Sequence, residues 1–396
     1  MKQNYRLTMI ACFIGYIAQA IINNFAPLLF VMFETSYAIP LSKITLLITI
    51  NFLVQLFVDL ATASLVDRIG QRPVAIFAHI LSAAGLILLT ILPDLLPDAY
   101  TGLLIAVIIY AFGGGLIEVL LSPILEACPT DNKETAMSLL HSFYCWGHVG
   151  VVLLSTVFFS VFGIQRWRIL AIAWALVPLG NAILFAKVPL YSLQSSDTPG
   201  LTFRQLFSLR IFWLMMLMML CAGAAEQAVS QWASAFAEQG LGVSKTVGDL
   251  AGPMAFAVLM GISRLIFSKY GERLDLRRFI RFSCVLCLLA YLCIALVPSP
   301  VVGLIGCAVC GFSVGIFWPG TLSCASAAIR GGGTAMFALL ALAGDLGCSG
   351  GPTLAGLVSS ASGNNLRAGI LAAIIFPVLL LAGSLLLGHT AKKNAL

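Results

Sequence analysis

Long apolar runs recur along the whole chain, separated by short polar or glycine- and proline-containing stretches. Many of them reach about 20 residues, the length that an α-helix needs to cross the hydrocarbon core of a bilayer. Charged residues make up only 10% of the sequence and hydrophobic residues 60%, whereas a soluble domain carries charge on about a quarter of its residues. A chain with so little charge cannot cover itself with a hydrated surface, so we expect it to fold in lipid.

The runs and their breakers predict an all-α membrane protein with twelve transmembrane helices. Their expected ranges are 7–33, 42–66, 73–92, 101–127, 134–162, 167–187, 210–236, 245–268, 278–298, 301–328, 333–359 and 367–389. The longest polar stretch falls at the midpoint of the chain, and turn-forming residues mark it as a linker. We therefore expect an N-terminal six-helix half over 1–188, a cytoplasmic linker over 189–208 and a C-terminal six-helix half over 209–396.

Basic residues are unevenly distributed between the two sides of this arrangement. If both termini are cytoplasmic, sixteen of the 22 Lys and Arg residues fall in inside segments and five in outside loops. That asymmetry satisfies the positive-inside rule, so we expect a multi-pass protein of the cell membrane, the inner membrane in a cell with two, with cytoplasmic termini. The basic residues are scattered singly and form no stripe, which argues against nucleic acid as a partner.

The sequences of the two halves share short patterns at an offset near 200 residues. Gly115 precedes Pro123 by eight residues in the fourth run, and Gly311 precedes Pro319 by eight in the tenth. A Thr-Ala-Met tripeptide opens both the fifth and the eleventh runs. Internal repeats of this kind are typical of transporters built from two related bundles.

The loop after the second run has the sequence Asp67-Arg68-Ile69-Gly70-Gln71-Arg72. It resembles the signature G-x-x-x-D-R-x-G-R-R of the major facilitator superfamily, with Ala63 in place of the first Gly and Gln71 in place of an Arg. Together with the length, the helix count and the central linker, the resemblance covers essentially the whole chain. It implies a secondary transporter whose two halves rock about a central site.

Within that superfamily the chain is most similar to the fucose, glucose and galactose proton symporters. The segments that carry this similarity are Asn23-Asn24, Gly115-Leu116-Ile117-Glu118 with Ser122-Pro123, and Leu140-His141-Ser142-Phe143. The resemblance implies proton-coupled uptake of a sugar or similar small polar solute. It also implies that Glu118, which occupies the place of an acid in the family's fourth helix, takes part in proton coupling.

Ionisable side chains inside the spans are strong site candidates, because each costs about 2.5–3.5 kcal/mol on insertion unless it faces a cavity or a partner. Glu118, Glu226 and Asp345 lie well inside the fourth, seventh and eleventh predicted helices, and we assign all three to proton coupling. The alternative is a buried pair with a His or Arg that only orients the helices.

Substrate contacts are expected from polar and aromatic groups at helical spacing. Gln19 and Asn23 are four residues apart, as are Gln227 and Gln231, so each pair shares one helix face. The expected substrate-binding residues are Gln19, Asn23, Asn24, His141, Glu226, Gln227, Gln231, Trp232, Trp318 and Asp345. For the tryptophans, anchoring at the membrane interface is the alternative.

Four charged residues near the cytoplasmic end of the second helix are expected to gate the transport cycle. They are Asp59, Asp67, Arg68 and Arg72. The last three could form a latch that holds the two halves together in one state only. Plain positive-inside charge is the alternative explanation for the two arginines.

Other classes of function lack their motifs. The chain has no G-x-x-x-x-G-K-[ST] loop for ATP and no H-E-x-x-H metal motif, so we expect neither an ATP-driven pump nor an enzyme. The cysteines lie mostly inside apolar runs, where they behave as small hydrophobes, and we expect no cofactor and no metal. We expect a monomer that binds a small-molecule substrate and protons. Export of drugs or amphipathic metabolites is the alternative transport function, and sodium the alternative coupling ion.

Overall fold

The computed structural model of the protein describes residues 5–130, 133–191, 201–270, 275–329 and 332–393. Helices connected by short turns account for nearly all of these residues, and no strand occurs among them. Contacts divide the chain into two compact units, a first unit of Met1–Ser195 and a second unit of Ser196–Leu396. Residues 192–200, at the centre of the predicted linker, lie outside the described residues.

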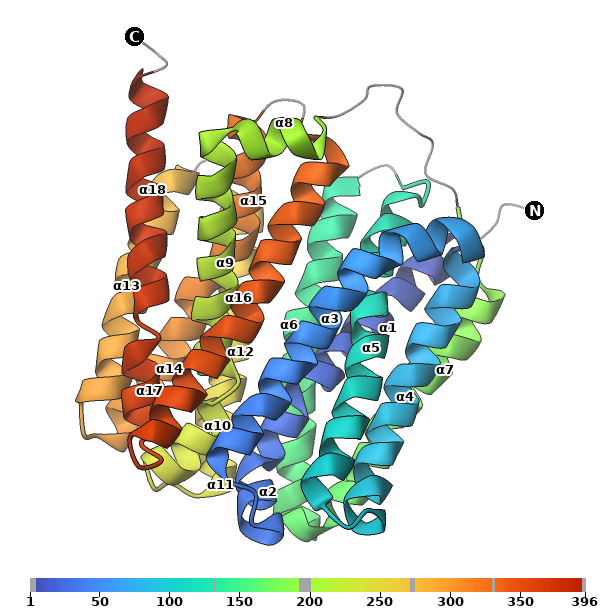
Figure 1. The fold of residues 1–396 in the computed structure, drawn as a ribbon, viewed down its shortest axis with the longest axis vertical. Helices are drawn as coiled ribbons and strands as arrows, with labels where there is room; N and C mark the ends of the chain where they lie inside the picture. Colours follow the sequence, from blue (N-terminus) through green and yellow to red (C-terminus); the bar gives the residue numbers. More distant parts are fainter. Residues whose placement is uncertain (1–4, 131–132, 192–200, 271–274, 330–331, 394–396) are drawn as a thin grey trace. The chain divides into compact units, whose positions relative to one another are not determined.

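The first unit is a bundle of long helices that run side by side (Figure 1). Its elements in chain order are α1 (Tyr5–Asn24), η1 (Ala26–Leu29), α2 (Phe30–Tyr37), α3 (Leu41–Ile69), α4 (Gln71–Leu95), α5 (Ala99–Glu126), α6 (Lys133–Phe162), η2 (Ile164–Arg166) and α7 (Trp167–Lys187). Gly70 separates α3 from α4 with a φ of +90°, a backbone conformation that glycine adopts without steric cost. The glycine of the signature loop is therefore required by the turn.

The second unit is also a helical bundle, and its long helices are interrupted more often. Its elements are α8 (Phe203–Ser208), α9 (Arg210–Ser230), α10 (Ala233–Ala235), η3 (Phe236–Gly240), α11 (Lys245–Asp249), η4 (Leu250–Met254), α12 (Ala255–Tyr270), α13 (Leu276–Leu296), α14 (Pro300–Val314), α15 (Phe317–Ala328), α16 (Gly333–Ala361), α17 (Leu366–Ala372) and α18 (Ile375–Lys393). The short helix α8 lies inside the stretch predicted as linker. A capping box between Thr202 and Gln205 starts it.

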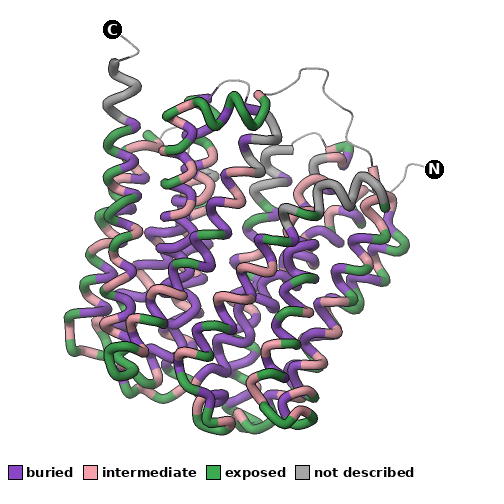
Figure 2. Tube along the Cα trace, in the orientation of Figure 1, coloured by how far each residue is buried: buried purple, intermediate pink, exposed green. Residues whose placement is uncertain are grey.

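The helices have the lengths that membrane spans need. The described residues contain 11 helical stretches that are long and apolar enough to cross a bilayer. The 29-residue helix α16 lies between the last two of these stretches and is long enough as well. Side chains such as Phe57, Leu176 and Val301 are 66%, 62% and 65% exposed, as expected of surfaces that face lipid. Figure 2 shows the buried residues gathered on the faces that the helices of each unit turn toward one another.

Several spans that the sequence predicts as continuous are broken. The first span ends α1 at Asn24 and continues through η1, where Pro27 lacks the backbone N–H that a regular helix needs. The seventh span is interrupted between Ser230 and Ala233, and a π-helical turn follows at η3. The first break follows directly after Gln19 and Asn23, whereas the second contains Gln231, the later member of the polar pair in the seventh span.

The repeated glycines hold equivalent helix pairs close together in the two units. A Cβ atom at Gly115 of α5 would lie 3.0 Å from the Gln55 carbonyl oxygen of α3. A Cβ atom at Gly311 of α14 would overlap the Phe256 carbonyl oxygen of α12. In each unit, the absence of a side chain at the repeated glycine lets the fourth helix approach the second.

Candidate functional site

In the first unit, the amide of Gln19 on α1 donates hydrogen bonds to a carboxylate on α5 and to an amide on α3. Its Nε2 atom donates to the Gln55 Oε1 atom of α3 at 2.8 Å and to the Glu118 Oε2 atom of α5 at 3.0 Å. Gln19 is only 2% exposed and Gln55 3%. Because only a nitrogen can donate to both oxygens, the network assigns the orientation of the Gln19 amide.

The same network continues to Asn23, the residue one turn beyond Gln19. The Asn23 Oδ1 atom accepts from Gln55 Nε2 at 2.9 Å and from Asn51 Nδ2 at 3.3 Å. Asn51 and Gln55 are four residues apart on α3, so they present one face to α1. We call these five side chains, Gln19, Asn23, Asn51, Gln55 and Glu118, the amide chain. It brings together three of the predicted site residues, whereas Asn51 and Gln55 were not predicted.

Asn24 and His141 lie beside the amide chain and make other contacts. Asn24 Nδ2 donates to the Ala20 carbonyl at 2.9 Å and to the Tyr144 hydroxyl at 3.4 Å. The imidazole of His141 meets the ring of Tyr16 edge-on, with 5.3 Å between the centroids. The Tyr16 hydroxyl is in turn 3.2 Å from the Ser122 Oγ atom on α5. Polar and aromatic groups from α1, α5 and α6 thus border the amide chain.

In the second unit, Glu226 of α9 forms an ion pair with Arg264 of α12. The Arg264 NH2 atom is 3.6 Å from the Glu226 Oε2 atom, and both side chains are largely buried. Gln227 Nε2 lies 3.4 Å from Glu226 Oε1, and Gln231 Nε2 donates to Gln227 Oε1 at 3.0 Å. Glu226, Gln227 and Gln231 therefore form one connected polar group, as their spacing suggested. Arg264, which the sequence analysis did not single out, belongs to it.

Arg264 also contacts the break in the tenth span. Its Nε atom donates to the Gly315 carbonyl at 3.3 Å, between the end of α14 and the start of α15. In an unbroken helix this carbonyl would accept from the N–H of the residue four positions later. That residue is Pro319, which has no N–H. One guanidinium thus satisfies a carbonyl freed by a proline and pairs with the carboxylate of the seventh span.

The two predicted tryptophans occupy different environments. Trp232 is fully buried, and its Nε1 atom donates to the Pro352 carbonyl of α16 at 3.0 Å, which fastens the break of the seventh span to the eleventh. Trp318 of α15 is half-buried, and its indole lies against Gly344, where a Cβ atom would overlap the ring. Asp345, the next residue of α16, is buried.

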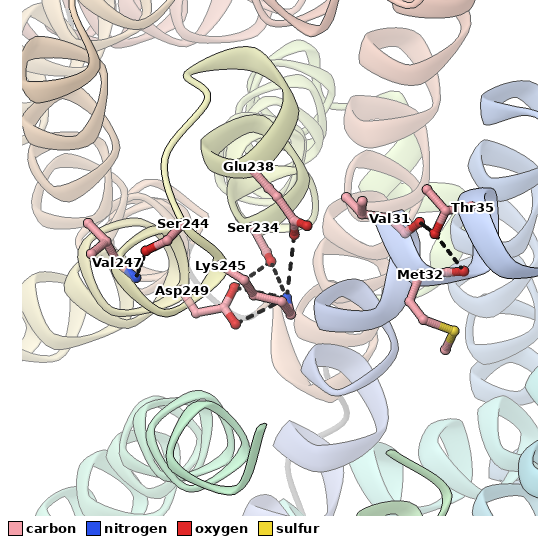
Figure 3. Close-up of polar contacts among 9 residues, drawn as sticks. All are labelled: Val31, Met32, Thr35, Ser234, Glu238, Ser244, Lys245, Val247 and Asp249. Atoms are coloured by element: carbon pink, nitrogen blue, oxygen red, sulfur yellow. Dashed lines mark hydrogen bonds and ion pairs between the residues drawn. The ribbon is translucent and has the colours of Figure 1, made fainter. Parts of the chain in front are cut away.

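A buried cluster in the second unit contains an acid that was not predicted (Figure 3). Asp249 is fully buried, accepts from the Ser234 hydroxyl at 2.5 Å and pairs with Lys245 at 3.1 Å. The Lys245 Nζ atom is also 3.9 Å from Glu238 Oε2. The cluster fastens α10 and η3 to α11 just beyond Trp232. Because Asp249 lies inside the eighth predicted span, the rule that singled out Glu226 would have found it too.

The predicted gating residues are only partly described by the structure. The side chains of Asp59, Asp67 and Arg68 lie outside the described residues. Arg72 donates to the carbonyls of Phe185 at 3.0 Å, Ala186 at 2.8 Å and Val188 at 2.8 Å, at the C-terminal end of α7. A cation at this end of a helix is favourable. These contacts lie within the first unit, and the latch between the halves stays a prediction.

One peptide has the letters of a hydrolase motif without its geometry. Gly347–Gly351 has the spacing G-x-S-x-G, which in hydrolases places the serine on a sharp turn between a strand and a helix. Here Ser349 is buried inside the regular helix α16. Gly347 packs against the Leu220 backbone of α9. Gly347 and Gly351 therefore serve helix packing against α9 and do not display a nucleophile.

Two helical units with membrane-length spans, broken helices and polar groups buried at the breaks are the architecture of a secondary transporter. A model of the Major Facilitator Superfamily matches residues 8–352, and the chain belongs to that superfamily. It is therefore a multi-pass membrane transporter of a small molecule and not an enzyme, as the sequence predicted.

Solved structures show the same fold. A bacterial homologue of the human lysosomal transporter Spinster, inward-facing and unoccupied, has a TM-score of 0.82 at 15% identity over 100% of this chain and 99% of that chain. The inward-facing and occupied structure of such a homologue has a TM-score of 0.77 at 14% identity, with the same coverage. A variant of the E. coli fucose:proton symporter, FucP, has 0.67 at 17% identity over 97% and 99%. No curated protein matches the chain.

Proposed function

We propose that the protein takes up a sugar or a similar small polar solute together with protons. The observation that carries the proposal is the amide chain of the first unit, in which four carboxamides end on the carboxylate of Glu118. Carboxamides both donate and accept hydrogen bonds, as the hydroxyl groups of a sugar do. A carboxylate is a group that can carry a proton through a transport cycle.

Two oxygen atoms of the chain support a ligand that donates hydrogen bonds. Gln19 Oε1 and Asn51 Oδ1 are buried and have no hydrogen-bond partner among the residues that the structure describes. A buried polar atom without a partner costs about 1–3 kcal/mol. Hydroxyl donors of a solute that enters beside the amide chain would remove that cost. The edge-on pair of Tyr16 and His141 offers aromatic surface nearby.

Substrate identity is tested first with the purified protein. A ligand that binds the folded state raises its melting temperature, so a thermal-shift screen should contain monosaccharides, amino acids and amphipathic cations. We expect stabilisation by one or more monosaccharides. Stabilisation by amphipathic cations alone would replace the proposal with the export alternative.

Coupling is tested with the same protein in liposomes. Glu118→Gln removes the ionisable oxygen and keeps the side-chain shape, so it should still exchange labelled for unlabelled substrate across the membrane. Accumulation driven by a pH gradient should be lost, because no proton can be released from this position. Asp345→Asn is the matched variant in the second unit, and loss of both exchange and accumulation there would assign Asp345 to substrate binding. A Glu118→Gln protein that accumulates substrate as steeply as the parent contradicts the proposal.

A further inference from the structure

The hydrogen bonds of the amide chain have a direction. At one end, Gln19 donates to Glu118 and to Gln55. At the other end, Gln55 and Asn51 both donate to the oxygen of Asn23. Each amide presents its oxygen to a donor and its nitrogen to an acceptor, so its orientation depends on that of its neighbour. A change of Glu118 from acceptor to donor must therefore affect the other amides.

The two oxygens without partners belong to Gln19, next to Glu118, and Asn51, at the far end of the chain. These residues are 2% and 6% exposed, so bulk water does not satisfy them. A half-turn of each carboxamide about its last torsion would exchange oxygen and nitrogen without moving the rest of the side chain. Such terminal torsions have two broad and nearly equivalent minima.

We propose that binding of a proton to Glu118 reverses the donor and acceptor roles along the amide chain. Protonation of Glu118 thereby changes which atom Asn23 presents. The inference rests on the proposed function only in requiring that Glu118 takes up a proton. The protonated Oε2 atom becomes a donor that faces the donating nitrogen of Gln19, so Gln19 turns and accepts through Oε1. Gln55 then donates to Gln19 Oε1, and Asn23 donates to both Gln55 and Asn51. One proton is added, and no covalent bond other than its own is made or broken.

The reversed chain keeps four hydrogen bonds, as many as the observed one. Both of the oxygens that now have no partner, on Gln19 and Asn51, become acceptors. Asn23 Oδ1, which in the structure accepts two hydrogen bonds, gives its place to Nδ2. Asn23 is the penultimate residue of α1, directly before the break in the first span. The reversal therefore exchanges the donor and acceptor sides of Asn23, a predicted substrate contact, when the proton arrives. Asn51 and Gln55 act in this scheme as positioning residues.

Other titratable groups surround α5 and could contribute to a response to pH. Tyr16 of α1 contacts Ser122, and His141 of α6 contacts Tyr16. The His79 Nε2 atom of α4 lies 2.8 Å from the Asn181 amide of α7. The side chain of Asp59 on α3 lies outside the described residues. A test must therefore assign the proton to Glu118 with its own variant.

The experiment is infrared difference spectroscopy of the full-length protein in lipid, recorded between two pH values without substrate. Labelling of asparagine or of glutamine side-chain carbonyls with carbon-13 separates the two kinds of amide. In the parent, we expect a carboxylic acid band that is lost in Glu118→Gln, together with asparagine and glutamine changes at the same pH. Gln55→Leu interrupts the chain, so it should keep the carboxylic acid band and lose the asparagine change.

Two further variants complete the test. Gln231→Leu is the matched control, because it removes a buried glutamine of the second unit whose amide donates to Gln227, and it should leave the asparagine change intact. Asn51→Leu shortens the amide chain at its far end, so the glutamine band change should remain while the asparagine band change decreases. The same variant replaces Gln55→Leu in the test if that protein fails to fold. An asparagine change that survives Gln55→Leu, or a Glu118 band without amide changes, overturns the proposal. Because no transport is measured, its failure is distinguishable from failure of symport.

Discussion

In the first unit the carboxylate of Glu118 accepts a hydrogen bond from an amide, whereas in the second unit the carboxylate of Glu226 pairs with an arginine. Glu118 accepts from the neutral Gln19, and Glu226 pairs with the Arg264 guanidinium. A proton added to Glu118 turns an acceptor into a donor within a neutral network. A proton added to Glu226 would remove an ion pair and leave a buried cation, which is costly. The comparison favours proton exchange for Glu118 and charge-balanced positioning for Glu226, and both roles stay proposals.

The largest expected effect breaks the ion pair of the second unit. Arg264→Leu leaves Glu226 buried without its cation and should cost about 3–5 kcal/mol of stability. The melting temperature of the purified protein measures this loss. Replacing both partners by leucine should recover most of it, because no charge is then left buried. A double variant that melts as low as the single one would show that Arg264 stabilises the unit through other contacts.

A second test compares the repeated glycines. Gly311→Ala places a methyl group on the Phe256 carbonyl, whereas Gly115→Ala places it 2.9 Å from the Val58 Cβ atom and 3.0 Å from the Gln55 backbone. Overpacking costs about 1–3 kcal/mol, and we expect Gly311→Ala near the top of that range and Gly115→Ala below it. Thermal unfolding of the two variants measures the order. Equal losses would mean that the two helix pairs tolerate separation equally well.

A third test separates the two contacts of Arg264. Pro319→Ala supplies the missing backbone N–H to the Gly315 carbonyl, so Arg264→Leu should cost about 1 kcal/mol less in that background, the net value of one hydrogen bond. A double-mutant cycle on the melting curves gives the difference. Pro123→Ala, at the equivalent place in the first unit, is the control and should leave the cost of Arg264→Leu unchanged. A coupling free energy of zero between Pro319 and Arg264 would mean that the Arg264 hydrogen bond to the Gly315 carbonyl does not contribute to stability.

The smallest expected effect concerns the starts of the two helices that carry the repeated glycines. Asp98 caps α5, and the hydrogen bond from the Thr101 hydroxyl lowers the pKa of its carboxyl group. The stabilisation by this cap is therefore complete above the ordinary pKa of Asp and is lost as the pH falls through the lowered one. The corresponding helix α14 starts with Pro300, and its N-cap Ser299 makes no side-chain hydrogen bond.

Hydrogen exchange in the first turn of each helix measures this difference. Exchange in α5 should accelerate at acidic pH more than in α14, after correction for intrinsic rates. Asp98→Asn should remove the difference, because an asparagine cap does not titrate in this range. Equal acid sensitivity of the two helices in the parent would contradict the assignment to Asp98.

Much of the fold follows from the sequence because bilayer thickness fixes the length of each apolar run. Helix ends at Lys187 and Phe162 agree with the predicted ranges for the same reason. The breaks were harder to predict. Pro27 and Pro319 mark two of them, but the interruption after Ser230 contains no proline. It depends on tertiary contacts such as the Trp232 bond to Pro352, which a single sequence does not reveal.

The site residues that could be predicted are those whose spacing within a single helix places them on one face. The four-residue spacing of Gln19 and Asn23 placed both amides on the face that meets Glu118. The same spacing in Asn51 and Gln55 was present in the second span and was missed. Arg264 could not be paired with Glu226 from spacing alone, because helical periodicity describes one helix and says nothing about which helices become neighbours.

The three hydrogen bonds of Arg72 have a consequence for biosynthesis. Its nearest acceptor along the chain, the Phe185 carbonyl, is 113 residues away. At a synthesis rate of about 5–20 residues per second, Arg72 is made roughly 6–23 s before that acceptor. Throughout this interval the charge of Arg72 is available to hold its loop on the side of the membrane where it was synthesised. Only when α7 is complete can the same charge join the ends of α4 and α7, so assembly of the first unit must wait for its last helix.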